Sequence, residues 1–189
     1  EGGYAWFFPK GRTANMGMGV LPSNTSALPN LLSDFLNFLR ESKKVPRVEI
    51  VSKTGGSIPC APYQKTSFKN TLLVGDAAGH AHPITGAGIL NAVIGGEIAG
   101  RIAAEAISIG DLQYLENYET EWQELFGKSL FHGAMKRKFL EEIWNKSGAD
   151  FERLIRKTWV GFREYYEDRK NFFYPLFEEV RATRTRGRW

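Results

Sequence analysis

Residues 70–107 constrain the fold most, because a short apolar run, a glycine-rich loop and a long helix follow one another there. Residues 71–74 are rich in branched apolar side chains, which predicts a buried strand. The step Gly75-Asp76 ends this run, and the loop after it can approach a ligand closely because glycine has no side chain. A strand that ends in a carboxylate places that group at the carboxyl edge of a sheet, where open α/β sheets bind ligands.

A helix is predicted after the loop, from Ala87 or Gly88 to about Ile107, with Thr85 as its N-cap. Small residues recur at helical spacing on one face of this helix, which predicts close packing against a sheet or a cofactor. These residues are Ala92, Gly95, Gly96, Ala99, Gly100, Ala103 and Ala104.

The loop can recognise a ligand in two ways. Asp76 can accept hydrogen bonds from sugar-like hydroxyl groups. Residues 83–88 are expected to present backbone N–H groups and a helix N-terminus to an anion or an electron-rich ring edge. An ordinary turn is the alternative, since a Gly-Asp step also occurs in turns.

The segment GDAAGHAHPITGAGILNAVIGGEIAG, residues 75–100, resembles the second flavin-binding motif of FAD-dependent oxidoreductases in the glutathione-reductase-like superfamily, in the branch that includes aromatic hydroxylases. The resemblance implies FAD as the cofactor, with Asp76 on the ribityl chain and with the loop and helix start along the isoalloxazine ring. The cofactor-binding positions that it implies are Gly75, Asp76, Gly79, Pro83, Gly86, Ala87, Gly88 and Ile89.

Aromatic residues alternate at the start of the chain. Tyr4, Trp6 and Phe8 share one face if they lie on a strand, and residues 14–20 predict the returning strand, with Gly11 in the turn. Such an aromatic face suits a long apolar ligand. The alternative is that these rings form the core face of a sheet.

The pattern YAWFFP, seven further residues and GMG resembles the Y-x-W-x-F-P-x7-G-x-G motif of geranylgeranyl reductases. The substrate-binding positions that this resemblance implies are Tyr4, Trp6, Phe8, Pro9, Gly17 and Gly19. It implies an FAD-dependent reductase that saturates double bonds of geranylgeranyl or related isoprenoid chains by hydride transfer from reduced flavin. The implied partners are an isoprenoid lipid or prenylated substrate and a reductant such as NAD(P)H or ferredoxin. No catalytic residue is predicted.

Other functions stay open. An electron-transfer flavoprotein dehydrogenase has a similar flavin loop but commonly adds a cysteine-ligated iron–sulfur module, which the single Cys60 cannot hold. A hydroxylase-like flavoprotein and a non-catalytic interaction module on a degenerate flavin fold are the further alternatives. Cys60 itself is interpreted as a small buried apolar residue.

Periodicity predicts the remaining secondary structure. Residues 28–39 have the pattern of an amphipathic helix with Pro29 in its first turn, and residues 47–52 predict a strand. Further helices are expected over residues 128–147 and 151–169, separated at Gly148.

The segment after Gly110 contains 17 of the 25 aromatic residues, so its helices must bury or line something large. Four aromatic residues recur every fourth position, which places them on one helical face and predicts that most are core. They are Tyr114, Tyr118, Trp122 and Phe126.

Charge and cysteine usage narrow the class of protein. Four arginines in residues 181–189 equal the whole net charge of +4, so nucleic-acid binding is not predicted. This tail is expected to be disordered or to contact anionic headgroups. One cysteine allows no intrachain disulfide, which favours a cytoplasmic protein. Peripheral membrane contact stays open.

The sequence predicts neither a membrane-spanning helix nor a metal site. A membrane-spanning helix is not predicted, because Glu97, Arg101 and Glu105 form a polar stripe on the long helix. A metal site is not predicted, because His80 and His82 offer two ligands with no third nearby.

Together these features predict an α+β fold that is the C-terminal part of a two-domain FAD-dependent oxidoreductase. We assign residues 1–66 to part of a substrate-binding domain with an antiparallel sheet, residues 67–109 to a returning strand and long helix of the FAD-binding domain, and residues 110–189 to a helical C-terminal region. No G-x-G-x-x-G follows a strand near the start, so no phosphate cradle for the ADP half of FAD is recognisable. We expect the isolated chain to be inactive.

Overall fold

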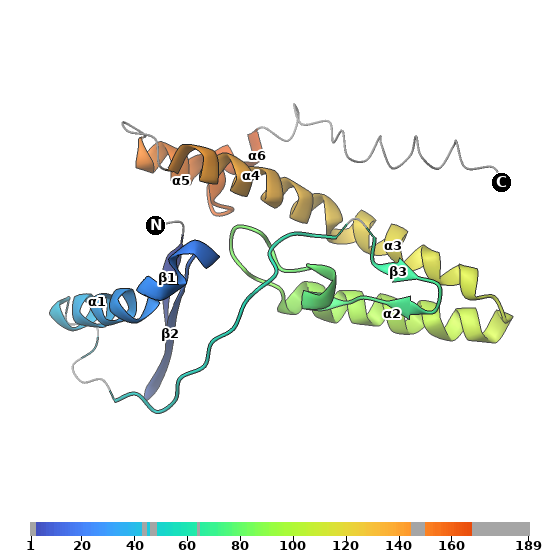
Figure 1. The fold of residues 1–189 in the computed structure, drawn as a ribbon, viewed down its shortest axis with the longest axis horizontal. Helices are drawn as coiled ribbons and strands as arrows, with labels where there is room; N and C mark the ends of the chain where they lie inside the picture. The colour runs from blue at the N-terminus through green and yellow to red at the C-terminus, as the bar shows by residue number, and fades with distance from the viewer. Residues whose placement is uncertain (1–2, 43–44, 46–48, 64, 145–149, 168–189) are drawn as a thin grey trace. The chain divides into compact units, whose positions relative to one another are not determined.

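The computed structural model describes residues 3–42, 45, 49–63, 65–144 and 150–167, and the chain divides into two compact units, Glu1–Gly56 and Ser57–Trp189 (Figure 1). The predicted α+β class is confirmed, because helices predominate among these residues and small antiparallel sheets accompany them. The three-part division at residues 66 and 109 stays a prediction. The arginine-rich tail and the break predicted at Gly148 lie outside the described residues.

The N-terminal unit begins with the predicted hairpin. Strand β1 (Tyr4–Lys10) pairs antiparallel with β2 (Thr13–Gly19), and Trp6 lies opposite Gly17. Gly11 has a φ of 63°, a left-handed conformation that suits the tight turn between the strands. The hairpin and its turn residue are therefore confirmed.

Helix α1 (Leu28–Glu41) follows the short turn η1 (Pro22–Ala27) and packs on β2. Pro29 lies in its first turn, where a missing N–H leaves no helix bond unmade. The predicted helix is confirmed, but the predicted strand over residues 47–52 is wrong for residues 49–52, which have no regular structure. Each sheet in the described residues contains two strands, and neither sheet pairs with residues 49–52.

The C-terminal unit begins with a very short hairpin, β3 (Ser67–Phe68) and β4 (Thr71–Leu72). The strand predicted over residues 71–74 is thus shorter than expected, because β3 offers only two residues to pair with. The chain continues extended, with the Leu73 N–H donating to the Thr66 carbonyl at 2.8 Å. It then forms the 3₁₀ turn η2 (Gly75–Ala78).

Helix α2 (Ile89–Ile109) is the long helix predicted after the loop. Its N-cap is Gly88, and no side chain caps it, so the prediction of Thr85 as N-cap is wrong. The Thr85 hydroxyl instead accepts the Ala87 N–H at 3.3 Å, within the loop.

A second long helical segment runs back along α2 (Figure 1). It comprises η3 (Leu112–Glu116), α3 (Asn117–Trp122), the π-helical turn η4 (Gln123–Gly127) and α4 (Lys128–Trp144). The core between the two consists of Ile98, Ala99, Ile102, Ala106, Leu115, Tyr118, Trp122, Phe126 and Leu130. The core role predicted for the aromatic series is confirmed for its last three members, whereas Tyr114 is half-buried at the edge.

Two aromatic side chains of the core also hold the β3–β4 region. The Tyr118 hydroxyl donates to the Leu73 carbonyl at 2.8 Å, and the Trp122 indole N–H donates to the Thr66 hydroxyl at 2.7 Å. Thr66 and both rings are fully buried, so each polar tip needs its partner. These bonds fix the strand that leads into Asp76.

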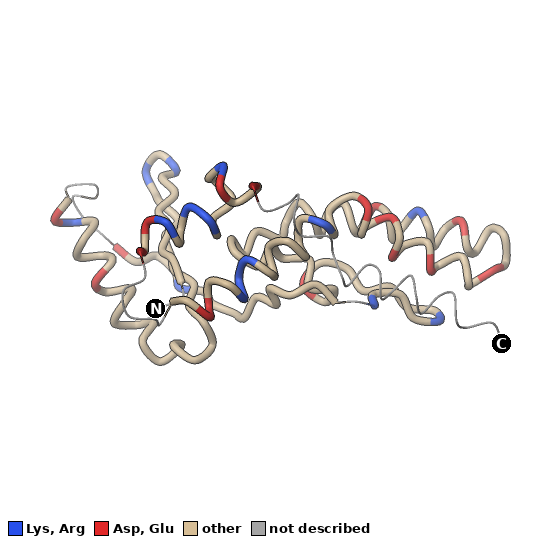
Figure 2. The backbone as a smooth tube through the Cα atoms, turned by 90° about the horizontal axis from the view of Figure 1, so that it is seen from above, with Lys and Arg blue, Asp and Glu red and all other residues tan. Residues whose placement is uncertain are grey.

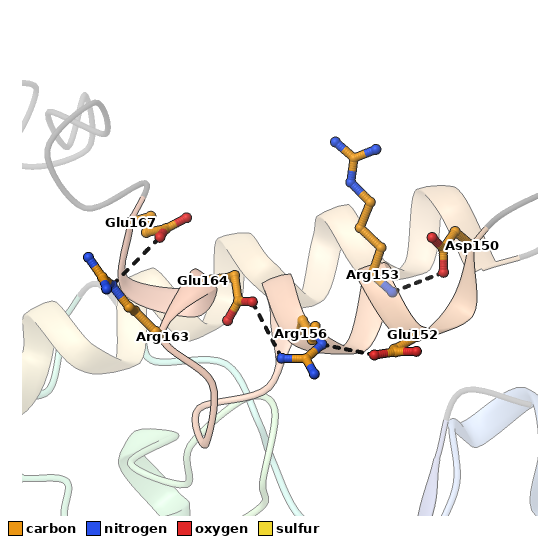
Figure 3. Close-up of polar contacts among 7 residues, drawn as sticks. All are labelled: Asp150, Glu152, Arg153, Arg156, Arg163, Glu164 and Glu167. Carbon is orange, nitrogen blue, oxygen red and sulfur yellow. Dashed lines mark hydrogen bonds and ion pairs between the residues drawn. The ribbon is translucent and has the colours of Figure 1, made fainter.

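Helices α5 (Phe151–Thr158) and α6 (Glu164–Glu167) end the described part of the chain. The single helix predicted over residues 151–169 is wrong, because the chain leaves the helix at Trp159, whose ψ is 130°. Arg156 pairs with Glu152 within α5 and with Glu164 of α6, and the second of these ion pairs spans the break (Figure 3). The Asp150 carboxylate caps α5 by accepting the Arg153 N–H at 3.1 Å.

Acidic and basic residues are interspersed along the described helices (Figure 2). Arg101 of α2, for example, pairs with Glu105 on its own helix and with Glu121 of α3. Within the described residues, no helix combines the length and apolar character that crossing a bilayer requires.

Candidate functional site

The N-terminal unit presents the predicted aromatic face. The Tyr4 and Trp6 rings lie 5.8 Å apart between centroids, as neighbours on one face of β1. Phe8 is 59% exposed and Tyr4 37% exposed, so this face is not the core face of a sheet within the described unit. The rings are therefore not buried within the described residues, and their role as a substrate-binding face stays a prediction.

Gly17 explains how the Trp6 ring lies flat on the hairpin. A Cβ at Gly17 would meet the Trp6 ring at 2.5 Å, which no real contact allows, so the indole occupies the space above this glycine. Gly19, opposite Tyr4, has open space around it. The predicted substrate-binding residues of this unit are thus brought together, with Pro9 following Phe8 on the same strand.

In the C-terminal unit, Asp76 and the start of α2 come together although they are separated by the whole loop. Asp76 is exposed, and its Oδ1 lies 3.7 Å from the position that a Cβ of Gly88 would take. Its carboxylate makes no hydrogen bond with the described residues and does not cap η2. The site therefore offers a free carboxylate beside an uncapped helix N-terminus, where the first-turn N–H groups have no intrahelical acceptor.

The loop between them is closed by bonds of its own. The His82 N–H donates to the Ala87 carbonyl, and the Gly86 N–H donates to the His82 carbonyl, each at 2.8 Å. The His82 Nδ1 also accepts the N–H groups of Ile84 and Thr85, at 3.3 and 3.4 Å. The prediction that residues 83–88 present their amides to a ligand is thus wrong for residues 84–87, and the amides that stay available begin at Gly88.

The other glycines predicted to bind the cofactor allow the turns and close contacts of residues 75–88. Gly86 has a φ of 66°, a left-handed conformation that closes the loop. A Cβ at Gly79 would lie 2.0 Å from the Ala61 carbonyl oxygen, so Gly79 lets the loop pack on that segment. Gly75, also left-handed, approaches Ala92 of α2. Pro83 is buried, whereas Ala87 and Ile89 are exposed beside Gly88.

Cys60 lies near this region, and the prediction that it is a small buried residue is only partly met. The thiol is half-buried rather than fully buried, and burial raises its pKa. The Arg137 guanidinium of α4 opposes this rise in pKa, and the Asp76 carboxylate adds to it. The charges of Asp76 and Arg137 thus both act at Cys60.

His80 and His82 differ in their surroundings. His80 is fully buried between Trp122, Phe126 and Gly95, with both ring nitrogens unbonded, and burial lowers its pKa from 6.5 to about 4. Burial also lowers the pKa of His82, whose ring nitrogen Nδ1 accepts the loop N–H groups described above. No group of three or more His, Cys, Asp or Glu side chains that could hold a metal ion occurs in the part of the chain that the structure describes.

Comparison with known proteins gives a consistent result. Residues 1–58 match the family profile described as geranylgeranyl reductase catalytic domain. The chain is 46% identical over 134 residues to a digeranylgeranylglycerophospholipid reductase of Methanosarcina acetivorans, covering 68% of this chain and 33% of that protein. It is 39% identical over 158 residues to digeranylgeranylglycerophospholipid reductase 2 of Methanothermobacter thermautotrophicus, covering 82% of this chain and 39% of that protein.

A solved structure agrees. A geranylgeranyl bacteriochlorophyll reductase-like protein from Thermoplasma acidophilum superposes with a TM-score of 0.62 at 26% identity, covering 88% of this chain and 47% of that one. The chain spans about a third of the length of the curated relatives that it matches.

Proposed function

Because this chain belongs to the geranylgeranyl reductase family, we propose that the protein carrying it is an FAD-dependent reductase that saturates double bonds of isoprenoid chains. Its relatives are named digeranylgeranylglycerophospholipid reductases, so a digeranylgeranylglycerophospholipid is the proposed substrate class. In this proposal the substrate side lies in residues 1–66 and one wall of the cofactor site in residues 67–109.

The observation that carries the cofactor proposal is the free carboxylate of Asp76 beside the uncapped N-terminus of α2. Such a pair suits a flavin, since a carboxylate accepts hydrogen bonds from ribityl hydroxyls and helix N-terminal amides suit an electron-rich ring edge. A Cβ at Gly88 would meet Ala81 at 3.3 Å, so this glycine lets the start of α2 lie close to the loop and to Asp76.

The residues of this chain hold and orient the reactants in this proposal. Asp76 binds the ribityl chain, and Gly88 and Ile89 border the ring. Bound and reduced, FAD supplies the hydride that an unactivated alkene needs. The exposed aromatic strip of Tyr4, Trp6 and Phe8 holds the apolar chain, because aromatic rings bury a large apolar area at little cost in side-chain entropy.

The remaining partners are proposed from the substrate. A lipid substrate is reached at a membrane surface, so we propose peripheral membrane contact of a cytoplasmic protein. The electrons come from NAD(P)H or ferredoxin in this proposal. Turnover of a digeranylgeranylglycerophospholipid with each reductant, measured with the native protein, tests both statements.

The cofactor proposal is tested by Asp76→Ala in the native protein that carries this chain. Loss of a hydrogen bond from a charged group is worth about 1.5–3 kcal/mol, so FAD retention should weaken about ten- to a hundredfold. The matched control is Asp111→Ala, which removes a carboxylate that accepts the Gln113 N–H at 2.8 Å as the cap of η3. The control should lower the melting temperature slightly and leave flavin binding unchanged. Equal flavin content per folded molecule in wild type and Asp76→Ala would contradict the cofactor proposal.

A further inference from the structure

The loop formed by residues 82–88 lies against helix α4. A Cβ at Gly133 would meet the His82 ring at 3.0 Å and Pro83 at 3.1 Å, so the helix approaches the loop as closely as packing allows. One turn further along α4, Arg137 Nη1 donates to the Pro83 carbonyl at 2.9 Å. Gly133 and Arg137 are four residues apart and therefore lie on the same face of α4.

A second contact comes from α6. The Tyr165 hydroxyl lies 3.4 Å from His82 Nε2, and Tyr165 is 1% exposed. Because His82 Nδ1 accepts two loop amides, the ring proton must reside on Nε2, which donates to the Tyr165 oxygen. The Tyr165 ring is itself held edge-on by His132, at 4.6 Å between centroids.

We infer that Gly133, Arg137 and Tyr165 are positioning residues that hold the loop of residues 82–88 in its cofactor-binding form. This inference rests on the proposed function. Arg137 fixes Pro83 from one side, and Tyr165 fixes the His82 ring, which in turn holds the amides of Ile84 and Thr85. The helical region after residue 110 thereby sets how tightly the start of α2 receives the flavin.

Arg137 is the best residue for a test because it is partly exposed and its contact with Glu141 can be removed separately from the others. Its Nε pairs with Glu141 at 2.9 Å, while its Nη1 binds the Pro83 carbonyl. Arg137→Met removes both bonds and the contact of the guanidinium with the Cys60 side chain but keeps the aliphatic stem, whereas the control Glu141→Gln removes only the ion pair. Arg137→Lys keeps the charge but not the fork of donors.

The first measurement is amide hydrogen exchange of the flavin-free native protein. We expect Arg137→Met to speed exchange of residues 82–88 about tenfold, the factor expected for one lost bond from a charged donor. Residues 98–106 in the core should be unchanged. Arg137→Lys should recover part of the protection, and Glu141→Gln should match wild type. Unchanged exchange of residues 82–88 in Arg137→Met would overturn the inference.

The second measurement is the dissociation constant for FAD together with the flavin absorption spectrum. We expect Arg137→Met to bind FAD about tenfold more weakly with an altered spectrum, which a merely structural residue would not cause. A loop that exchanges faster while FAD affinity and spectrum stay at wild-type values would also overturn the inference. If the wild-type protein binds no FAD, the proposed function fails and the cofactor-positioning role fails with it. The exchange measurement then still shows whether Arg137 and Tyr165 hold the loop of residues 82–88.

Tyr165→Phe provides a second variant in case Arg137→Met does not fold. It removes one oxygen atom and keeps the ring that packs on His132. We expect faster exchange at Ile84 and Thr85 in particular, since these amides depend on the His82 ring. Exchange equal to that of wild type at both amides would count against the contact between Tyr165 and His82.

Discussion

Two glycines in the middle of α2 should respond in opposite ways to the same substitution. A glycine inside a helix destabilises it by about 1 kcal/mol relative to alanine, so changing either glycine to alanine should stabilise the helix by about that amount if the new methyl group meets no other atom. An alanine at Gly100 meets nothing within 4 Å. Gly100→Ala should therefore stabilise the chain by about 0.5–1 kcal/mol.

Gly95 is different because its side of the helix is filled. A Cβ there would lie 3.2 Å from His80 Nδ1, 3.3 Å from His80 Cε1 and 3.4 Å from Val74. The His80 ring cannot move away, since it is fully buried against Trp122 and Phe126. Overpacking of a core costs about 1–3 kcal/mol, which cancels or exceeds the helix gain. Gly95→Ala should be less stable than Gly100→Ala by about 1–3 kcal/mol.

Equilibrium urea unfolding of the chain, followed by far-ultraviolet circular dichroism, measures this difference. Gly96→Ala is a further control, because its nearest neighbour would be Val74 at 4.0 Å, and it should resemble Gly100→Ala. Combining Gly95→Ala with His80→Ala should recover part of the lost stability, since the smaller side chain gives the new methyl group room. If Gly95→Ala proves as stabilising as Gly100→Ala, the packing of His80 on α2 described above is wrong.

The remaining predictions concern the buried polar groups of the C-terminal unit. His80 has a pKa of about 4 in the folded chain against 6.5 when exposed, so the unfolded chain binds more protons between these values. The free energy of unfolding should be highest above pH 6.5 and should fall as the pH is lowered toward about 4, by at most about 3 kcal/mol. In urea unfolding, His80→Leu should lack this part of the pH dependence. Trp122→Phe should lower the free energy of unfolding by about 1–3 kcal/mol more than the loss of ring size alone, because the fully buried Thr66 hydroxyl loses its hydrogen-bond donor. Adding Thr66→Val should recover part of that loss in a double-mutant cycle. Strictly additive effects of the two changes would contradict the bond.

Local patterns predicted the elements that depend on neighbouring residues alone. The alternation of Tyr4, Trp6 and Phe8 predicted β1, and apolar periodicity predicted α1. The small residues of α2 were expected to pack closely, which is confirmed at Gly95 and Ala99 but not at Gly100. Periodicity identifies a face of a helix, but it does not tell which part of that face another element covers.

The features that were missed depend on contacts between distant segments. Pairing between Ser67 and Leu72 decides where β4 ends, and no residue within the apolar run signals that end. The ring of His82 takes the loop amides that were expected to face a ligand. Arg137 binds the Pro83 carbonyl 54 positions away in sequence, and an arginine on a helix with polar neighbours carries no mark of such a partner.

The π-helical turn η4 lets the helix hold one extra residue without changing the face that the following residues present. Such a turn accommodates about one residue more than an α-helical turn, and each residue advances an α-helix by about 100°. Deleting one residue from this turn, such as Leu125, which is 67% exposed, would let the helix continue as regular α-helix. The same deletion would leave Gly133 and Arg137 facing the loop, because a turn with one residue fewer completes nearly the same rotation. A residue lost from the regular helix between Lys128 and His132 would instead rotate Gly133 and Arg137 about 100° away from the loop, so the π turn is the place in this segment that tolerates a change in length.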